Sequence, residues 1–195
     1  MLNIFLIVGK SGTGKSTLAN MLVTRCHMRQ LDSYTTRAPR EPGESGHIFI
    51  TNEQMDVIYA TQNVVAETTF DGNRYCATQQ QIEDNDIYVV DPSGVNYLAE
   101  KYKGQKNIVV IELDCDDDEC LQNRMLARGD TLSSIQSRLE NDIKKFDETP
   151  IVPWVDHFKI RVKNIDPDDV FDIAKKIITY KQKDEIKKKI GGNIL

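Results

Sequence analysis

The sequence predicts an α/β fold with a parallel β-sheet at its centre and helices on both faces. Short apolar runs recur at residues 2–8, 87–90 and 108–113. Continuous runs of this kind are typical of strands that are buried on both faces. Segments with the apolar spacing of helices lie between them, and strands that alternate with helices pair in parallel. A glycine-rich loop after the first run completes a strand–loop–helix pattern.

This loop, residues 9–16, reads GKSGTGKS and fits G-x-x-x-x-G-K-[ST] at every fixed position. Its glycines let backbone N–H groups approach a phosphate, and the following helix adds the positive end of its dipole. Lys15 supplies a charge for the β- and γ-phosphates, and the Ser16 hydroxyl is a ligand for Mg²⁺. We therefore predict a nucleotide-binding loop for ATP, with Mg²⁺ as cofactor. The residues expected to bind ATP here are Gly9, Ser11, Gly12, Thr13, Gly14, Lys15, Ser16 and Thr17.

The next part of the chain predicts a small mixed region rather than another strand–helix repeat. Prolines and glycines mark a loop up to residue 46, and Asp71-Gly72-Asn73 is a typical hairpin turn. The expected elements are, in order, a helix at 17–25, a short strand at 47–50, a helix at 53–61, hairpin strands at 63–70 and 74–77, and a short helix at 79–83.

The second half returns to the alternating pattern. The strand at residues 87–90 ends at Asp91, and carboxylates at the carboxyl end of a buried parallel strand lie where open α/β sheets bind ligands. The expected elements after it are a helix opened by residues 92–94, a strand at 108–113, helices at 116–127 and 132–146, a strand at 158–162, and a terminal helix from 167. The lysine-rich end of that helix, residues 181–189, is interpreted as a solvated helix end rather than a site for an anionic partner.

The composition is that of one soluble globular domain. The 195 residues are 39% hydrophobic and 28% charged, which is ordinary for such a domain. The net charge of -5 disfavours general nucleic-acid binding but allows one small anion in a locally basic pocket. We find no apolar run long enough for a membrane and no signal peptide, and we expect a cytoplasmic protein. The four cysteines show no metal-ligand spacing and are interpreted as reduced thiols.

Arginines form two clusters outside the loop. Arg37 and Arg40 flank Pro39 on a turn, and Arg124, Arg128 and Arg138 lie on the two helices around Gly129. A guanidinium group grips phosphate with a forked set of donors. Two such clusters beside one phosphate loop favour a site that holds two phosphorylated ligands.

Together, these motifs resemble the guanylate kinase family. The segments that carry the resemblance are 9–17, SYTTRAPR at 33–40 with GE at 43–44, FDGNRY at 70–75, VDPSG at 90–94, RMLARG at 124–129, RL at 138–139 and NID at 164–166. They occur in the order of the family and span residues 9 to about 176. The loop alone indicates phosphate binding, whereas the T-T-R-x-P-R segment is far more specific.

The resemblance implies a P-loop kinase that transfers the γ-phosphoryl group of ATP to GMP or dGMP. It implies a core at about 1–32, 86–115 and 139–195, an inserted mixed α+β subdomain at about 33–85 that binds the acceptor nucleotide, and a helical lid at about 116–138. The expected partners are therefore small-molecule nucleotides, with neither nucleic acid nor a membrane. The protein is expected to be a monomer or a homodimer.

Residue by residue, the resemblance implies roles for both arginine clusters. Ser33, Arg37, Arg40 and Tyr75 match residues that bind the acceptor nucleotide, and Asp91 matches a carboxylate on the acceptor side. His47 stands where the family usually has a tyrosine, and its N–H groups can also donate to phosphate. Arg124, Arg128 and Arg138 match lid arginines that join Lys15 in catalysis, and Asn164 matches a residue near the adenine.

The base-reading positions depart from the family pattern. The family reads guanine with a glutamate before the hairpin and a serine after its tyrosine, and those slots hold Ala66 and Ala77. Glu67 and Thr78 have suitable side chains but lie one position later, and one step along a strand reverses the face. We include both as acceptor-binding candidates on the condition that a bulge restores their direction. Asp130 adds a negative charge to the lid.

Three interpretations therefore stay open. The first is a guanylate kinase with GMP or dGMP as acceptor. The second is a kinase of the same fold that acts on another nucleoside monophosphate or a sugar phosphate. The third is a non-catalytic guanylate-kinase-like module that binds a protein, and the intact loop and arginines place it last.

Overall fold

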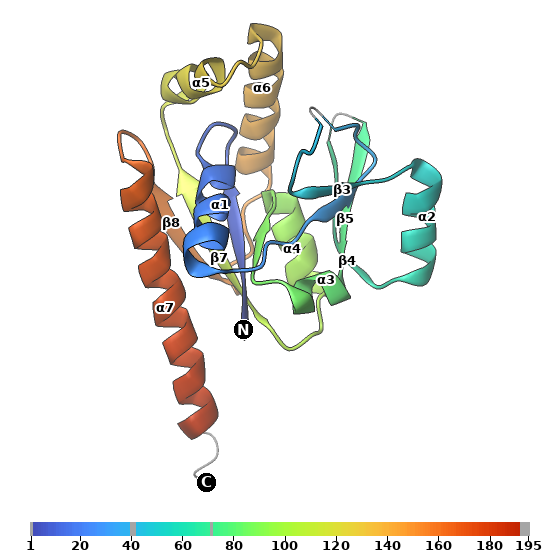
Figure 1. The fold of residues 1–195 in the computed structure, drawn as a ribbon, viewed down its shortest axis with the longest axis vertical. Coiled ribbons are helices and arrows are strands. Elements are labelled where there is room, and N and C mark those ends of the chain that lie inside the picture. The colour runs from blue at the N-terminus through green and yellow to red at the C-terminus, as the bar shows by residue number, and fades with distance from the viewer. Residues whose placement is uncertain (1, 40–41, 71, 192–195) are drawn as a thin grey trace.

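The computed structural model describes residues 2–39, 42–70 and 72–191, and it contains two β-sheets (Figure 1). The core sheet has the order β6-β1-β7-β8, and all of its pairings are parallel. Its strands are β1 (Asn3–Gly9), β6 (Ile87–Val89), β7 (Asn107–Asp114) and β8 (Asp156–Arg161). The predicted α/β class with a parallel central sheet is thus confirmed.

Helices cover both faces of the core sheet because β1 is apolar on both sides. Phe5 and Ile7 pack with α1 (Lys15–Cys26) and α7 (Pro167–Gly191) in one buried cluster. The intervening residues, Ile4 and Leu6, pack in a second cluster with α4 (Pro92–Lys101). Every residue of β1 is buried, so this strand is held from above and below. Its carboxyl end, where the glycine-rich loop begins, is therefore fixed in place.

A second sheet stands beside the core and comes from the inserted part of the chain. Its order is β3-β2-β5-β4, with β2 (Ser33–Thr35) parallel to β3 (His47–Phe49) and β5 (Asn73–Thr78) antiparallel to both of its neighbours. β4 (Val64–Phe70) packs along α4, and α2 (Asn52–Thr61) covers the other side through Met55 and Ile58. The short helix α3 (Gln79–Asp84) leads back to the core.

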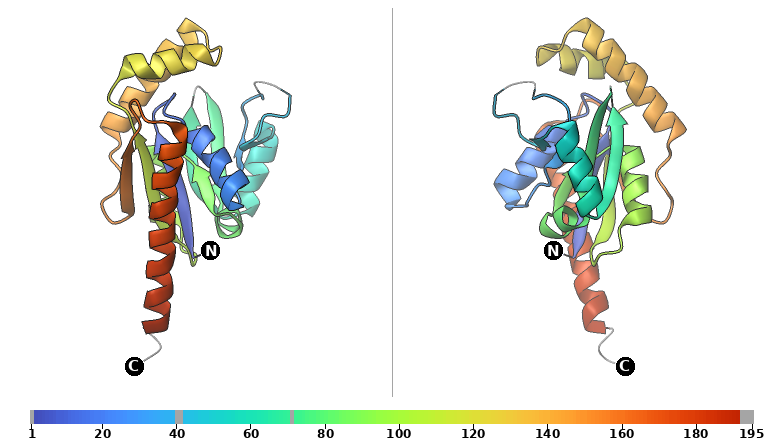
Figure 2. Two further views of the ribbon diagram at one scale, coloured as in Figure 1. Left: turned by 60° about the vertical axis from the view of Figure 1, so that its left-hand side comes forward. Right: turned by 90° about the vertical axis from the view of Figure 1, so that its right-hand side faces the viewer.

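Two helices arch over the carboxyl edge of the core sheet (Figure 2). They are α5 (Asp118–Ala127) and α6 (Leu132–Glu148), and Gly129 turns the chain between them at a φ of 94°. α6 is amphipathic: Ile135 and Leu139 are buried and most of its other residues are not. Because it crosses the loop end of β1, its inward face borders the glycine-rich loop.

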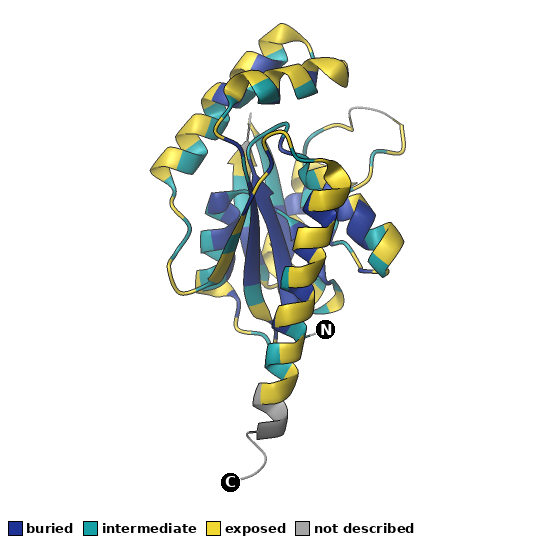
Figure 3. Ribbon diagram, turned by 90° about the vertical axis from the view of Figure 1, so that its left-hand side faces the viewer, coloured by how far each residue is buried: buried dark blue, intermediate teal, exposed yellow. Residues whose placement is uncertain are grey.

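The predicted elements recur with small shifts at their ends, and one strand was not predicted. β2 has only three residues, too few for a periodic pattern, and it exists because β3 and β5 supply its hydrogen bonds. α7 is amphipathic against the core and then runs past the end of the sheet, with an exposed outer face (Figure 3). Among the described residues, no helix is both long enough and apolar enough to span a membrane. The predicted hairpin turn includes residue 71, which lies outside the described residues.

Candidate active site

The glycine-rich loop lines a cavity of about 590 Å³ at the carboxyl end of β1, which we call the donor cavity. A Cβ on Gly9 would stand 2.6 Å from the carbonyl oxygen of Leu113, so only glycine fits there. Gly14 begins α1 at a φ of 96°, and no side chain caps the helix. The first N–H groups of α1 therefore point toward the cavity without a side-chain acceptor. Residues 11–18 all line it.

Lys15 lies over this loop. Its Nζ donates to the carbonyl oxygens of Gly9 at 2.6 Å and Lys10 at 2.9 Å. Burial lowers the pKa of the Lys15 ammonium to about 8, while the nearby carboxylate of Asp142 acts in the opposite direction. Arg128 also lowers this pKa, so the lysine stands among other cations in a desolvated site.

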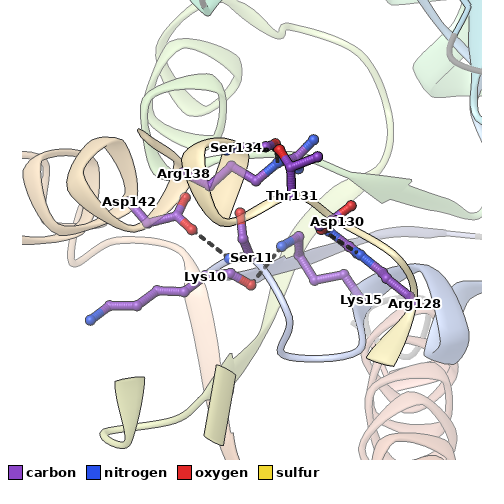
Figure 4. A network of polar contacts seen from close by, with 9 residues as sticks. All are labelled: Lys10, Ser11, Lys15, Arg128, Asp130, Thr131, Ser134, Arg138 and Asp142. Carbon is purple, nitrogen blue, oxygen red and sulfur yellow. Dashed lines mark hydrogen bonds and ion pairs between the residues drawn. The ribbon is translucent and has the colours of Figure 1, made fainter. Parts of the chain in front are cut away.

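The three arginines predicted for the lid all line the donor cavity. Arg124 donates from Nη2 to the carbonyl oxygen of Val162 at 2.9 Å, which ties α5 to the segment after β8. Arg128 pairs with Asp130 at 2.8 Å from Nε, and Arg138 donates from Nε to Ser134 Oγ at 3.2 Å (Figure 4). The structure thus gathers the predicted lid cations around the loop.

A second cavity of about 980 Å³ lies between the core and the inserted sheet, and we call it the acceptor cavity. It joins the donor cavity at one place, because Ser11, Lys15, Ser16 and Arg138 line both. From the inserted sheet, Ser33, His47 and Tyr75 line it, as predicted for acceptor-binding residues. The Ser33 Oγ lies 2.9 Å from His47 Nδ1, and the His47 ring packs edge-on against Tyr75 with centroids 5.5 Å apart.

Arg37 lies behind the wall of the acceptor cavity. Both of its terminal nitrogens donate to Glu44, at 2.6 Å and 3.2 Å, and its side chain is 13% exposed. Arg37 does not line the cavity, whereas Glu44 and Tyr75, which both interact with its guanidinium group, do. Arg40, its predicted partner, lies outside the described residues.

Asp91 joins three parts of the molecule in the acceptor cavity. Its Oδ1 accepts from the backbone N–H of Gly94 and from Ser93 Oγ, each at 2.8 Å, which caps α4. Its Oδ2 accepts from Thr68 Oγ1 of the inserted sheet at 3.1 Å and from Lys145 of α6. Burial would raise the pKa of the Asp91 carboxyl, but the charge and hydrogen bonds of Lys145 and the capping donors lower it.

The residues that line the acceptor cavity but were not singled out in the sequence include Thr68, Asp142 and Lys145. Asp142 Oδ2 accepts from the backbone N–H of Ser11 at 2.5 Å. A signal for two of them was present, because Arg138, Asp142 and Lys145 are spaced by four and three residues and therefore share one face of α6. The position of Thr68 in the cavity wall depends on the register of β4 against β5, which the sequence did not determine.

Glu67 and Thr78 do not line the acceptor cavity, which corrects the prediction for both. A bulge does interrupt β4, but it lies between Val64 and Ala66 and leaves Ala66 opposite Ala77. Ala66 and Ala77 are 1% and 0% exposed. Glu67 therefore turns to the far face, where it takes a hydrogen bond from the hydroxyl of Tyr59. Thr78 instead caps α3, with its Oγ1 accepting from the backbone N–H of Gln81 at 3.3 Å.

Asn164 lies apart from the donor cavity. It adopts a left-handed backbone with a φ of 57° and lines a smaller cavity with Asp117 and Arg124. The segment after β8 and the start of α7 give the donor cavity an apolar part instead. Its lining residues there are Val162, Ile165, Pro167 and Val170.

Few side chains in the site can ligate a metal ion. Among the described residues, no group of three or more His, Cys, Asp or Glu side chains is placed to hold a metal ion. The Ser16 hydroxyl lines both cavities at their junction. One hydroxyl suits Mg²⁺, which keeps waters and takes further ligands from substrate phosphates.

Known proteins resemble this chain along most of its length. Residues 1–180 match the family described as guanylate kinase. The guanylate kinase of Histophilus somni (strain 129Pt) is 28% identical over 163 residues, which are 75% of this chain and 76% of that protein. That of Bordetella pertussis (strain Tohama I) is 28% identical over 146 residues, 70% of this chain and 66% of the relative. The crystal structure of guanylate kinase from Anaplasma phagocytophilum has the same fold, with a TM-score of 0.63 at 18% identity over 93% of this chain and 87% of that one.

Proposed function

The chain belongs to the guanylate kinase family, and we propose on this basis that it transfers the γ-phosphoryl group of ATP to GMP or dGMP. The products are ADP and the corresponding nucleoside diphosphate. The observation that carries the proposal is the meeting of the two cavities at Ser11, Lys15, Ser16 and Arg138. A donor nucleotide in one cavity and an acceptor in the other would direct their phosphates at the same place.

On the donor side, the loop amides and the start of α1 bind the polyphosphate of ATP. Lys15 turns from the carbonyls of Gly9 and Lys10 to the β- and γ-phosphates. The apolar end of the cavity at Val162 and Ile165 packs against the adenine. Mg²⁺ bound at the Ser16 hydroxyl supplies positive charge that neutralises the phosphates.

On the acceptor side, Ser33, His47 and Tyr75 contact the nucleoside monophosphate. Arg37 binds its phosphate in place of Glu44, because a phosphate offers the same bidentate geometry as a carboxylate and more charge. Asp91 stays ionised and positions the acceptor through Thr68 and its other partners. Arg40 is proposed here from its sequence motif alone.

The reaction needs no strong general base, because the attacking group is a phosphate oxygen. The task of the protein is to hold two polyanions in line and to neutralise charge on the transferred group. Lys15, Arg128 and Arg138 lie where they can do this. In this proposal α5 and α6 act as a lid that keeps water from the phosphoryl group.

A second candidate function is favoured by the alanines of the inserted sheet. Ala66 and Ala77 face each other in the buried core and present no polar atom to a base. The hydroxyls of Ser33 and Thr68, which line the acceptor cavity, can donate or accept. An acceptor other than guanine, such as another nucleoside monophosphate, therefore fits this cavity as the alternative.

The test is an ADP-release assay with ATP and Mg²⁺ against each common ribo- and deoxyribonucleoside monophosphate. A clear preference for GMP and dGMP supports the first candidate, and a flat profile supports the second. If none of these monophosphates supports ADP release at any concentration, both candidate functions are contradicted. Lys15→Ala assayed in parallel shows whether the turnover belongs to this site.

A further inference from the structure

A carboxylate of the lid helix sits on the phosphate loop. Asp142 extends from α6 toward the loop, and its Oδ2 accepts from the backbone N–H of Ser11 at 2.5 Å (Figure 4). Ser11 lines both cavities, so this contact lies at their junction. Asp142 itself is half-buried and lines the acceptor cavity.

The charge of Asp142 acts on the same groups that a phosphate would use. Of the charged side chains around Lys15, Asp142 has the largest effect on that ammonium group. Lys15 nevertheless donates to the carbonyls of Gly9 and Lys10. The carboxylate therefore adds negative potential at the loop and occupies one of its N–H donors. A polyphosphate placed there would meet a like charge in a partly desolvated site, where repulsion is strong.

We propose that Asp142 is an internal competitor of the donor phosphates, and that a bound nucleotide displaces it from the N–H of Ser11. The inference rests on the proposed function only in requiring that the loop binds nucleotide phosphates. Asp142 lies one helical turn after Arg138 on the same face of α6, beside the junction of the two cavities. In this proposal Asp142 lowers the affinity for the donor.

The test compares Asp142→Asn with the wild-type chain in calorimetric titrations with ADP. Asparagine keeps the shape and an acceptor oxygen for Ser11 but removes the charge. We expect ADP to bind about ten-fold more tightly to this variant, the size expected for one nearby like charge at a partly exposed site. Asp147→Asn is the matched control, because Asp147 lies on the same helix and is exposed. Its affinity for ADP should equal that of the wild type.

Asp142→Ala provides a second measurement that does not depend on affinity. Amide hydrogen exchange at Ser11 should be slow in the wild type and faster in this variant, because the acceptor is gone. ADP should bind to Asp142→Ala at least as tightly as to Asp142→Asn. Melting temperatures near that of the wild type show that both variants are folded.

An unchanged or weakened ADP affinity in both Asp142 variants would overturn the inference, since the carboxylate would then be neutral or helpful. If the wild type binds ADP too weakly to measure, measurable binding by Asp142→Asn supports it and continued absence overturns it. The binding assay needs no acceptor. If ADP binds the Asp142 variants more tightly but no monophosphate supports ADP release, this inference is supported and the proposed function is contradicted.

Discussion

The donor and acceptor cavities differ in how the chain builds them. One contiguous segment, residues 11–18, lines the donor cavity, and the strand that precedes it, β1, is buried along its whole length. The acceptor cavity is assembled from side chains on β2, β3, β4 and β5, together with Asp91 and α6. The geometry of a contiguous motif is set by the spacing of its residues along the chain. The wall of the acceptor cavity, in contrast, depends on the face of the sheet to which each strand residue points. The lining of the donor cavity can therefore be predicted from the sequence, whereas that of the acceptor cavity can be predicted only in part.

The largest expected effect is on the donor side. Lys15→Ala should lower kcat by about a thousand-fold or more, because it removes a cation that we propose neutralises the transferred group. The fold should persist, since within the described part of the chain the Lys15 side chain donates its hydrogen bonds to the loop carbonyls of Gly9 and Lys10. Steady-state ADP release and a thermal melt measure the two quantities.

Lys10→Ala is the control for this variant. The Lys10 side chain extends away from Lys15 (Figure 4), and its nearest acidic partner is Asp118 at 4.0 Å. Turnover close to that of the wild type is expected. Equal losses in the two variants would mean that turnover depends on the total positive charge of the loop rather than on Lys15 specifically, and the role proposed for Lys15 would be wrong.

The next effect separates the two cavities. Arg37→Ala should raise the KM for the acceptor by about ten- to a hundred-fold, the size of a lost charge-assisted pair, and leave the KM for ATP nearly unchanged. Arg74→Ala is the matched control, because Arg74 also pairs with a carboxylate in the inserted part of the chain. Its partner, Asp56, does not line the acceptor cavity, whereas Glu44, the partner of Arg37, does. Equal changes in both KM values for Arg37→Ala would show that the acceptor site is misplaced.

A pH effect is expected on the donor side alone. Burial lowers the pKa of Lys15 to about 8, so in the free protein the ammonium is charged below that pH and neutral above it. ADP affinity should be constant at lower pH and fall as pH rises through 8, by up to about ten-fold per pH unit. Titrations across this range, repeated with Lys15→Ala, provide the measurement. A profile that is equally steep in the variant would assign the titration to another group.

The smallest effect concerns Glu67. Because its side chain turns to the far face and contacts Tyr59, Glu67→Gln should change kcat/KM for GMP by less than about two-fold. Thr68 is the next residue and faces the cavity, so Thr68→Ala should weaken binding of the acceptor more than Glu67→Gln does. A large loss of GMP use in Glu67→Gln with little change in Thr68→Ala would reverse the assignment of the two faces.

These differences also explain what the sequence could predict. The buried strands, the loop, the convergence of Arg124, Arg128 and Arg138, and the cavity positions of Ser33, His47, Tyr75 and Asp91 follow from local pattern and motif order. The direction of Glu67 was left conditional on a bulge, and the sequence does not show where a bulge lies. In the structure the bulge is between Val64 and Ala66, outside the regularly paired run that contains Glu67. The contact of Asp142 with Ser11 joins positions 131 residues apart and depends on where α6 crosses the loop. The individual roles of the site residues stay predictions.

We propose that two nucleotides bind end to end in the donor and acceptor cavities, which meet at Lys15 and Arg138. The most direct measurement is a calorimetric titration with a dinucleoside polyphosphate that joins adenosine to guanosine, compared with ADP and GMP separately. We expect one binding event at least about a hundred-fold tighter than that of either nucleotide alone, because the second half of the ligand binds intramolecularly. Binding no tighter than that of ADP would contradict it.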